Sequence, residues 1–213
     1  MNIERNLALA IGARRSIRRY RREPIERKII ERLLLAATRA PSPHNRQPWR
    51  FAVIEDDVSK RKLARAMGER LRADRMADGD DMTAIDADVA RSRERIEGAP
   101  VVIVLCIDME GMDRYLDSRR IHAEYLMAAQ SAAMAAQNLL LAAHTEGLGA
   151  CIMCAPLFCP DTVVETLKLS RGWTPQMLLT VGIPLDDGSD RPRAALDEIV
   201  RWLPRGAVAS SAS

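Results

Sequence analysis

The sequence predicts an α+β fold, because strand-like apolar runs occur between segments with helical periodicity. Residues 101–107 form an uninterrupted apolar run, which indicates a strand buried on both faces. From about Asp117 to Thr145 the chain is rich in Ala, and Gly147 follows as a stop signal, which predicts one helix of roughly 40 Å. The 213 residues are enough for a single domain with a proper core.

In the first half of the chain, the pattern predicts helices on either side of one strand. Residues 3–13 form a short helix, and a second helix that can begin at Pro24 continues to about Arg39. A basic extended segment lies between these helices. A proline-rich loop then leads into a strand over Arg50–Glu55.

Two charged helices follow, at residues 58–72 and Thr83–Glu97, and a mobile connector over Asp74–Asp81 joins them. Because this hairpin lies between two core strands, we expect it to be an exposed excursion, placed at residues 69–97. A lid over a pocket is one role that such an excursion could have.

The second half is organised around the long helix, whose small side chains permit close helix contact. We expect it to be a central helix, with packing against a second subunit as one option. A turn at Gly147 and Gly149 precedes a strand or extended loop, residues 161–169 form a helix, and Gln176–Val181 forms another strand. A polar loop over residues 186–193 follows.

The domain organisation and the composition are those of a globular protein. We assign residues 1–204 to one domain and residues 205–213 to a disordered tail. Hydrophobic residues make up 47% and charged residues 29%, and the net charge of +3 with 4% aromatics does not favour a nucleic-acid partner. Residues 1–20 do not form a signal peptide, and polar side chains along the long helix argue against a membrane span, so we expect a cytoplasmic protein.

The four cysteines, Cys106, Cys151, Cys154 and Cys159, are expected to be thiols in that compartment. The Cys151-x-x-Cys154 spacing with Cys159 nearby is compatible with a metal or redox site. No His or further Cys stands at the spacing of a zinc finger, and the surrounding residues are apolar. We therefore expect no metal.

A basic motif, Arg14-Arg15-Ser16-Ile17-Arg18, is the first candidate site. In an extended segment, Arg14, Ser16 and Arg18 point to one side. Two guanidiniums and a hydroxyl that converge on one point can bind a phosphate, because Arg offers a planar fork of donors. A solvated basic strip is the alternative, since six Arg lie between Arg14 and Arg22.

A proline-rich loop, Pro41-Ser42-Pro43-His44-Asn45-Arg46-Gln47-Pro48-Trp49, is the second candidate site. Its three prolines exclude a helix, and its small and amide side chains suit a flat polar ligand. The alternative is a rigid helix-to-strand connector in which Trp49 fills the core and His44 is a hydrogen-bonding spacer. The two motifs, R-x-S-x-R and then P-S-x-x-N-x-Q-P-W, resemble the FMN-dependent nitroreductase family in sequence and in order.

This resemblance covers nearly the whole chain and implies a mixed, mostly antiparallel sheet flanked by helices in an intertwined homodimer. Two FMN sites would lie at the subunit interface, with the proline-rich loop reaching the flavin of the opposite subunit. Relatives often have an acidic residue and a Gly where this chain has Cys154 and Ala155. The resemblance implies these FMN-binding residues: Arg14, Arg15, Ser16, Arg18, Pro41, Ser42, Pro43, Asn45, Ile152, Met153, Cys154, Ala155, Arg191 and Arg193.

Within that set, the resemblance gives each segment its own part of the cofactor. The Arg14–Arg18 motif and one of Arg191 and Arg193, preferably Arg193, would hold the phosphate. A solvated turn is the alternative for that late pair. The backbone over Ile152–Ala155 would lie against the redox face of the flavin, so no side chain is assigned as catalytic.

The implied reaction is a ping-pong transfer of hydride from NAD(P)H through FMN to a small, flat, electron-poor acceptor such as a nitroaromatic or a quinone. A second interpretation comes from the motifs P-S-P-H-N-R-Q-P-W-R-F and G-L-G-A-C with the later Trp173-x-Pro175 and Gly182-x-Pro184, which look like the reductase domain of deazaflavin-coenzyme biosynthesis. That domain reduces a dehydro precursor. A third interpretation is an FMN carrier or sensor without turnover. The sequence does not choose between NADH and NADPH.

Overall fold

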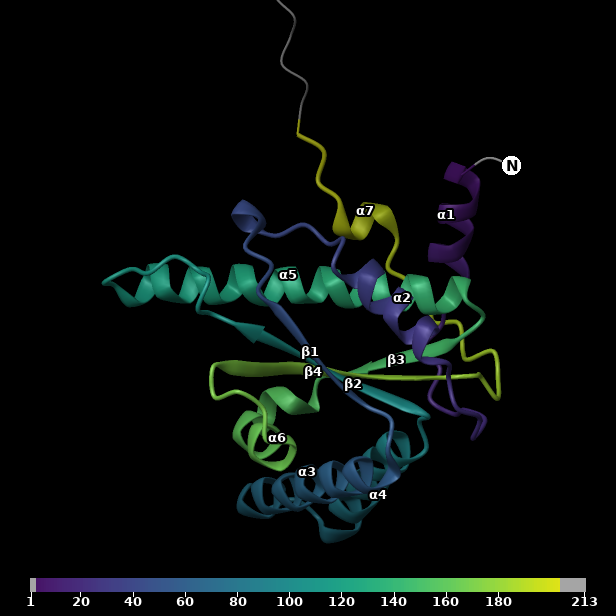
Figure 1. Cartoon of the computed structure of the whole chain (residues 1–213), viewed down its shortest axis with the longest axis vertical. Helices are drawn as coiled ribbons and strands as arrows, with labels where there is room; N and C mark the ends of the chain where they lie inside the picture. Colours follow the sequence, from purple (N-terminus) through teal and green to yellow (C-terminus); the bar gives the residue numbers. More distant parts are fainter. Residues whose placement is uncertain (1–2, 204–213) are drawn as a thin grey trace, which may run out of the picture.

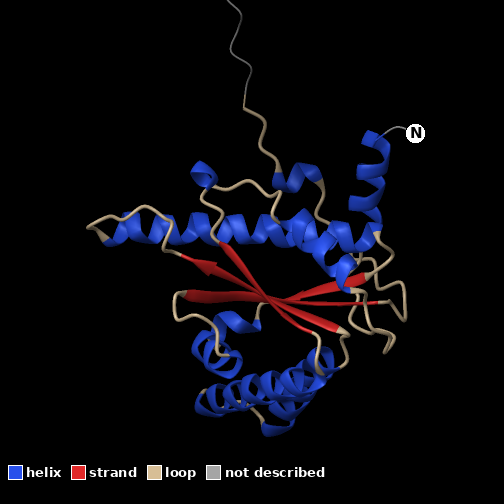
Figure 2. Cartoon of the chain, in the orientation of Figure 1, coloured by secondary structure: helices blue, strands red, loops and turns tan. Residues whose placement is uncertain are grey.

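The computed structural model describes residues 3–203, and its centre is a four-stranded antiparallel sheet with helices on both faces (Figures 1 and 2). The strands have the order β1-β2-β4-β3. Their bounds are β1 (Trp49–Ile54), β2 (Val101–Asp108), β3 (Gly149–Met153) and β4 (Trp173–Gly182). An isolated parallel bridge from Ser16 to Ala150 also places the basic segment beside β3.

The helices and their bounds agree with the predicted pattern for most of the chain. Two short 3-10 helices accompany them, η1 (Pro43–Asn45) and η2 (Ala155–Phe158). The α-helices are α1 (Ile3–Ala13), α2 (Arg27–Ala37), α3 (Asp57–Ala77), α4 (Met82–Glu97), α5 (Ser118–Thr145), α6 (Pro160–Leu167) and α7 (Leu196–Ile199).

Strand β2 explains why its sequence is apolar throughout. Val101, Ile103, Leu105 and Ile107 face a core formed with α2 and α5, whereas Val102, Val104 and Cys106 face a second core formed with α3, α4 and α6. Every residue from Val101 to Ile107 is buried. Both faces of the strand are therefore covered by helices, as the apolar run predicted.

Helix α5 is the central helix of the first layer, as the sequence predicted. Its Asp117 side chain caps the first turn by accepting a hydrogen bond of 3.0 Å from the Arg120 amide. An 18-residue window reaches a mean hydropathy of 1.2, which is enough to cross a membrane by length and composition alone. Here that apolar character is used in the core, because Ala128, Ala132 and Ala135 are fully buried.

Two predicted boundaries in the first hundred residues are wrong, each for a local reason. Helix α2 begins at Arg27 rather than at Pro24. Ile25 packs in the first core, and Glu26, with a ψ angle of 134°, is not yet helical. Helix α3 continues to Ala77, so the first half of the predicted connector, residues 74–77, is helical. The charges that suggested a connector form ion pairs instead, such as the 2.8 Å contact between Arg70 and Asp74.

The α3–α4 hairpin is the layer on the second face of the sheet (Figure 1). Leu63, Met67 and Ile96 are buried in the second core. The buried Lys60 ammonium donates to the carbonyl oxygens of Ala99 and Pro100 at 2.8 and 3.2 Å and so ties α3 to the start of β2. The hairpin thus has a structural role, and its function as a lid stays a prediction.

At the C-terminal end, strand β4 begins at Trp173, earlier than the predicted Gln176, and α7 is a short helix that the sequence pattern did not indicate. Residues 184–195 form the predicted polar loop. The predicted disordered tail, residues 205–213, lies outside the described part of the chain.

Candidate functional site

The basic segment is held beside β3 and the end of β4 as an extra edge. The Ile17 amide donates to the Ala150 carbonyl oxygen at 3.1 Å, and the Arg21 amide donates to the Ile183 carbonyl oxygen at 2.9 Å. Gly149 makes this contact possible, because a Cβ atom there would lie 2.6 Å from the Cβ atom of Ile17. The extended conformation that the sequence predicted for this segment is therefore fixed by backbone pairing.

Tyr20 anchors the end of the segment in the second core. Its hydroxyl donates to the Ile17 carbonyl oxygen at 2.5 Å and lies 2.8 Å from the Thr180 hydroxyl on β4. Burial raises the pKa of Tyr20 above its usual value, which keeps the hydroxyl protonated. The anchor links the basic segment to the strand that also pairs with β3.

Alternation along the segment separates its arginines into two pairs. Ile17 is buried, and Arg15 and Arg19 share its side, where they form ion pairs with Asp190 at 3.1 Å and Asp186 at 2.9 Å. Of the remaining residues of the motif, Arg14 and Ser16 are half-buried and Arg18 is exposed. Within residues 3–203, neither Arg14 nor Arg18 forms an ion pair with a carboxylate.

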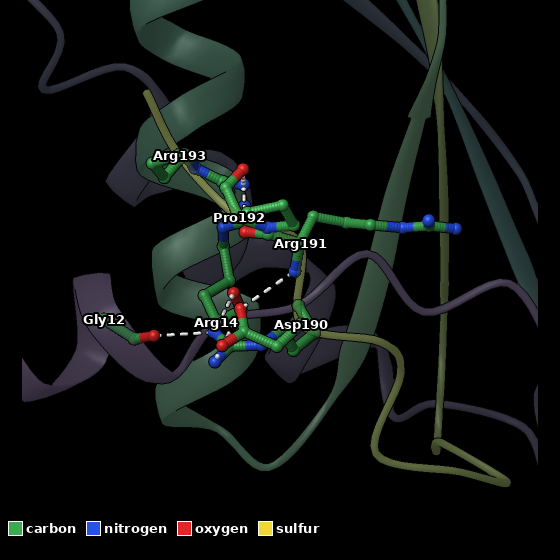
Figure 3. A network of polar contacts seen from close by, with 7 residues as sticks. Gly12, Arg14, Asp190, Arg191, Pro192 and Arg193 are labelled. Atoms are coloured by element: carbon green, nitrogen blue, oxygen red, sulfur yellow. Dashed lines mark hydrogen bonds and ion pairs between the residues drawn. The ribbon is translucent and has the colours of Figure 1, made fainter. Parts of the chain in front are cut away.

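The loop after β4 brings the late basic pair to this segment. Figure 3 shows Gly12 and Arg14 beside Asp190 and the stretch from Arg191 to Arg193. The Arg193 guanidinium donates to the Arg191 carbonyl oxygen at 2.8 Å. The structure therefore brings together two segments that are about 175 residues apart in the sequence (14 and 191), as the sequence reasoning expected.

A cavity of about 260 Å³ lies between the basic segment and the C-terminal end of α5. Arg14 and Arg15 line it from one side, whereas Ser16 and Arg18 do not. His144, Asp186 and Asp187 also line it, and the sequence reasoning did not select any of these three. The sequence signal for Asp186 and Asp187 was the acidic cluster after Pro184, in a loop whose position depends on tertiary contacts. His144 has no such signal, because it lies near the end of a long helix.

The end of β3 lies further along the same edge. Because Ser16 pairs with Ala150 in parallel, the segment and β3 run in the same direction, and Cys154 lies about 13 Å beyond Ala150 along an extended chain. Cys154 is exposed, Ile152 and Ala155 are half-buried, and Met153 is buried. A ligand could thus contact the arginines at one end and this backbone at the other.

The proline-rich loop is strained and lies elsewhere in the chain. His44, Asn45 and Gln47 have φ angles of 48°, 54° and 49°, a left-handed conformation that non-glycine residues seldom adopt. The Ser42 hydroxyl accepts a 3.0 Å hydrogen bond from the Gln47 amide, and an ion pair of 2.5 Å joins Arg46 to Asp113.

Within one chain, the structure does not bring this loop to the basic segment. The Asp113 contact places the loop toward the N-terminal end of α5, whereas the cavity beside Arg14 is at the C-terminal end (Figure 1). Trp49 is 5% exposed and packs in the first core, as predicted. Pro41, Ser42, Pro43 and Asn45 remain at the surface or half-buried.

The cysteines are separate thiols within the described chain. Cys106, Cys151 and Cys159 are buried and Cys154 is exposed. Burial raises the pKa of the Cys106 thiol to about 12 and also raises the pKa of Cys159. Residues 3–203 contain no group of three or more His, Cys, Asp and Glu side chains arranged to hold a metal ion.

The chemistry of this donor set fits a phosphate monoester. Arg14 and Arg18 offer planar guanidiniums without a competing carboxylate partner in the described chain, and Ser16 adds a hydroxyl between them. Beyond them, the exposed backbone after β3 is free of bulky charged side chains. The basic segment beside β3 is therefore a candidate phosphate-binding site in an α+β fold.

Comparison with known proteins makes the class specific. The profile of the Nitroreductase family matches residues 11–183, and this chain belongs to that family. It is an FMN-dependent NAD(P)H oxidoreductase.

Individual relatives agree with this assignment. A Thermus thermophilus protein named NADH dehydrogenase is 30% identical over 213 residues, covering 89% of this chain and 92% of its own. A Desulfovibrio desulfuricans protein solved in complex with FMN is 27% identical, with a TM-score of 0.72 and coverage of 96% and 99%. The fold is also that of the FMN-dependent nitroreductase NfnB of Mycobacterium smegmatis, at a TM-score of 0.74, 22% identity and coverage of 95% and 100%.

Proposed function

We propose that the chain reduces a flat, electron-poor small molecule, of nitroaromatic or quinone type, with NAD(P)H as the donor and in a ping-pong sequence. The observation that carries this proposal is that Ser16 pairs with Ala150 near the start of β3, while Arg14 and Arg18 on either side of it form no ion pair with a carboxylate of residues 3–203. Bound FMN would supply the hydride chemistry. The protein's own residues would bind and orient the cofactor.

Each segment of the site has a proposed task. Arg14, Ser16 and Arg18 would hold the FMN phosphate, with Arg193 as the further donor and Arg191 beside it. Arg15 would contribute only if a bound phosphate competes with its present partners, which are Asp190 and the carbonyl oxygen of Gly12 at 2.6 Å.

At the other end of the site, the backbone from Ile152 to Ala155 would lie against the flavin ring. The exposed side chain of Cys154 would stand beside it. An amide there would donate to the cofactor, and the site needs no acid or base from the protein for hydride transfer.

We further propose that the active form is a homodimer in the cytoplasm. The loop with Pro41, Ser42, Pro43 and Asn45 is too far from the basic segment of its own chain, so a second copy would supply it. Ile121 and Leu126 on α5 are 51% and 45% exposed, which supports burial of this helix against a partner. The cytoplasmic location is supported by the use of NAD(P)H as the electron donor, because such nucleotides are available to enzymes inside the cell.

The dimer proposal predicts that subunit dissociation and flavin loss occur together. Analytical ultracentrifugation of the yellow protein across a dilution series, with absorbance followed at 280 nm and at about 450 nm, measures both (the wavelengths at which protein and flavin absorb). We expect the flavin signal to sediment only with the dimer. A flavin-loaded monomer would contradict the proposal.

The reaction itself can be tested by anaerobic stopped flow. We expect NADH or NADPH to bleach the flavin absorbance of the FMN-loaded protein rapidly, and a nitroaromatic or quinone to restore it after the nucleotide has left. FMN rather than FAD should be released by acid. The order of mixing tests the ping-pong sequence, because reduced protein freed of nucleotide must still react with the acceptor.

The alternatives give different results in the same instrument. Slow bleaching with both nucleotides, followed by reoxidation of the dithionite-reduced protein by a dehydro deazaflavin precursor, would favour the biosynthetic reductase. If no organic acceptor reoxidises the reduced protein, the carrier or sensor function would replace the reductase. One relative, a Rhodospirillum rubrum protein 27% identical to this chain, is named 5,6-dimethylbenzimidazole synthase, so relatives carry out more than one reaction.

A further inference from the structure

The acidic loop after β4, residues 186–190, forms ion pairs with Arg15 and Arg19 of the basic segment and, within residues 3–203, with neither Arg14 nor Arg18. The Asp186 carboxylate accepts from the Arg19 Nε atom at 3.0 Å, and the Asp190 carboxylate pairs with Arg15 at 3.1 Å. Both contacts are made to odd-numbered residues, which share the side of buried Ile17.

The loop is shaped for this position by its own contacts. Gly188 has a φ angle of 71°, and a Cβ atom there would lie 2.9 Å from the Arg15 Cβ and 2.9 Å from the Ile17 Cδ1. The Gly188 amide also donates to the Asp186 carboxylate at 3.0 Å. Only a residue without a side chain fits between the loop and the segment in this conformation.

Asp190 has a second contact, with the backbone of Arg191, which together with Arg193 forms the basic pair after β4. The carboxylate oxygen that pairs with Arg15 also accepts a 3.0 Å hydrogen bond from the Arg191 amide (Figure 3). The Asp190 side chain therefore holds both the Arg15 guanidinium and the Arg191 amide, two residues before Arg193. The loop thus pairs with the guanidiniums of Arg15 and Arg19, and Arg14 and Arg18 have no carboxylate partner in the described chain.

We propose that Asp190, supported by Asp186 and Gly188, is a positioning residue for the cofactor phosphate. It neutralises Arg15 and holds the loop so that the phosphate meets Arg14, Ser16 and Arg18, with Arg193 alongside. Without this clamp, the guanidiniums on both sides of the segment would compete for the anion, and Arg193 would lose its anchor. This inference rests on the proposed FMN site.

The substitution Asp190→Asn separates positioning from simple charge. Removing a negative charge near a bound dianion should tighten FMN binding if only the local field matters. If Asp190 positions the donors, the same change weakens FMN binding, by about fivefold, the upper end for an exposed ion pair. The dissociation constant is measured by titrating apoprotein with FMN and following flavin fluorescence.

Riboflavin, which lacks the phosphate, is the second ligand in the test. We expect Asp190→Asn to leave riboflavin affinity unchanged, whereas general loosening of the fold would weaken both ligands. Asp190→Glu keeps the charge and should largely restore FMN binding. Gly188→Ala changes no charge but displaces the loop, and it should show the same selective loss of FMN.

A matched control is Glu31→Gln, which removes the carboxylate of an exposed ion pair with Arg27 on α2 and should not alter FMN affinity. Equal or tighter FMN binding by Asp190→Asn, or an equal weakening of FMN and riboflavin binding, would overturn the inference. Failure of wild-type protein to bind FMN would instead overturn the proposed function, so the two failures are distinguishable.

Discussion

Replacing Arg14 or Arg18 by Ala weakens FMN binding by about 1.5–3 kcal/mol for each charge-assisted hydrogen bond that the substitution removes. The physical reason is that each side chain offers a guanidinium that no carboxylate of the described chain neutralises. Charge-assisted hydrogen bonds are roughly twice as strong as neutral ones, so their loss has a large effect on binding. Titration of the apoprotein with FMN gives the free energy directly.

The matched control is Arg27→Ala on α2, because Arg27 already pairs with Glu31 and lies outside the basic segment. It should leave FMN affinity unchanged. The double substitution of Arg14 and Arg18 should weaken binding more than either alone, and riboflavin should bind all variants alike. Unchanged FMN affinity in the Arg14 and Arg18 variants would make the basic segment a solvated surface strip.

The substitution Leu139→Ala lowers the free energy of unfolding by about 2–5 kcal/mol, because it opens a cavity in a packed core. Leu139 is fully buried on α5 and belongs to the core that this helix shares with β2 and α2. Urea unfolding followed by circular dichroism measures the change. An effect below about 1 kcal/mol would mean that the core relaxes around the site.

Leu126→Ala is the matched comparison on the same helix, since Leu126 is 45% exposed in the single chain. In an isolated subunit its truncation should have a small effect on unfolding. If α5 packs against a second copy, the destabilisation by Leu126→Ala grows and the unfolding midpoint depends on protein concentration. The pair of variants thus separates core burial within a chain from burial between chains.

Much of the fold could be predicted from local patterns because those patterns record burial directly. Residues 101–107 are apolar at every position because both faces of β2 are covered. Helix α5 follows from its Ala content, its Asp117 cap and the stop at Gly147, whose φ angle is 75°. Such signals lie within a few residues of one another, so no tertiary information is needed to recognise them.

The candidate site could be predicted only in part. R-x-S-x-R and the proline-rich loop were selected from residue chemistry and from resemblance, and the extended conformation predicted for the basic segment was confirmed where Ser16 and Ile17 pair with Ala150. The sequence did not show that Asp186 and Asp190 would take Arg15 and Arg19. Those ion pairs join residues whose separation in sequence is at least 167, so no local pattern contains them.

By itself, the sequence determined the strands, the central helix, the extended conformation of the basic segment and the family-specific motifs. Tertiary structure decided where α2 begins, how the α3–α4 hairpin covers the sheet, and which arginines remain open to a ligand. It also placed the proline-rich loop far from the basic segment of its own chain. The physical reason is that local propensity fixes backbone conformation over a few residues, whereas charge pairing and burial depend on which distant segments meet.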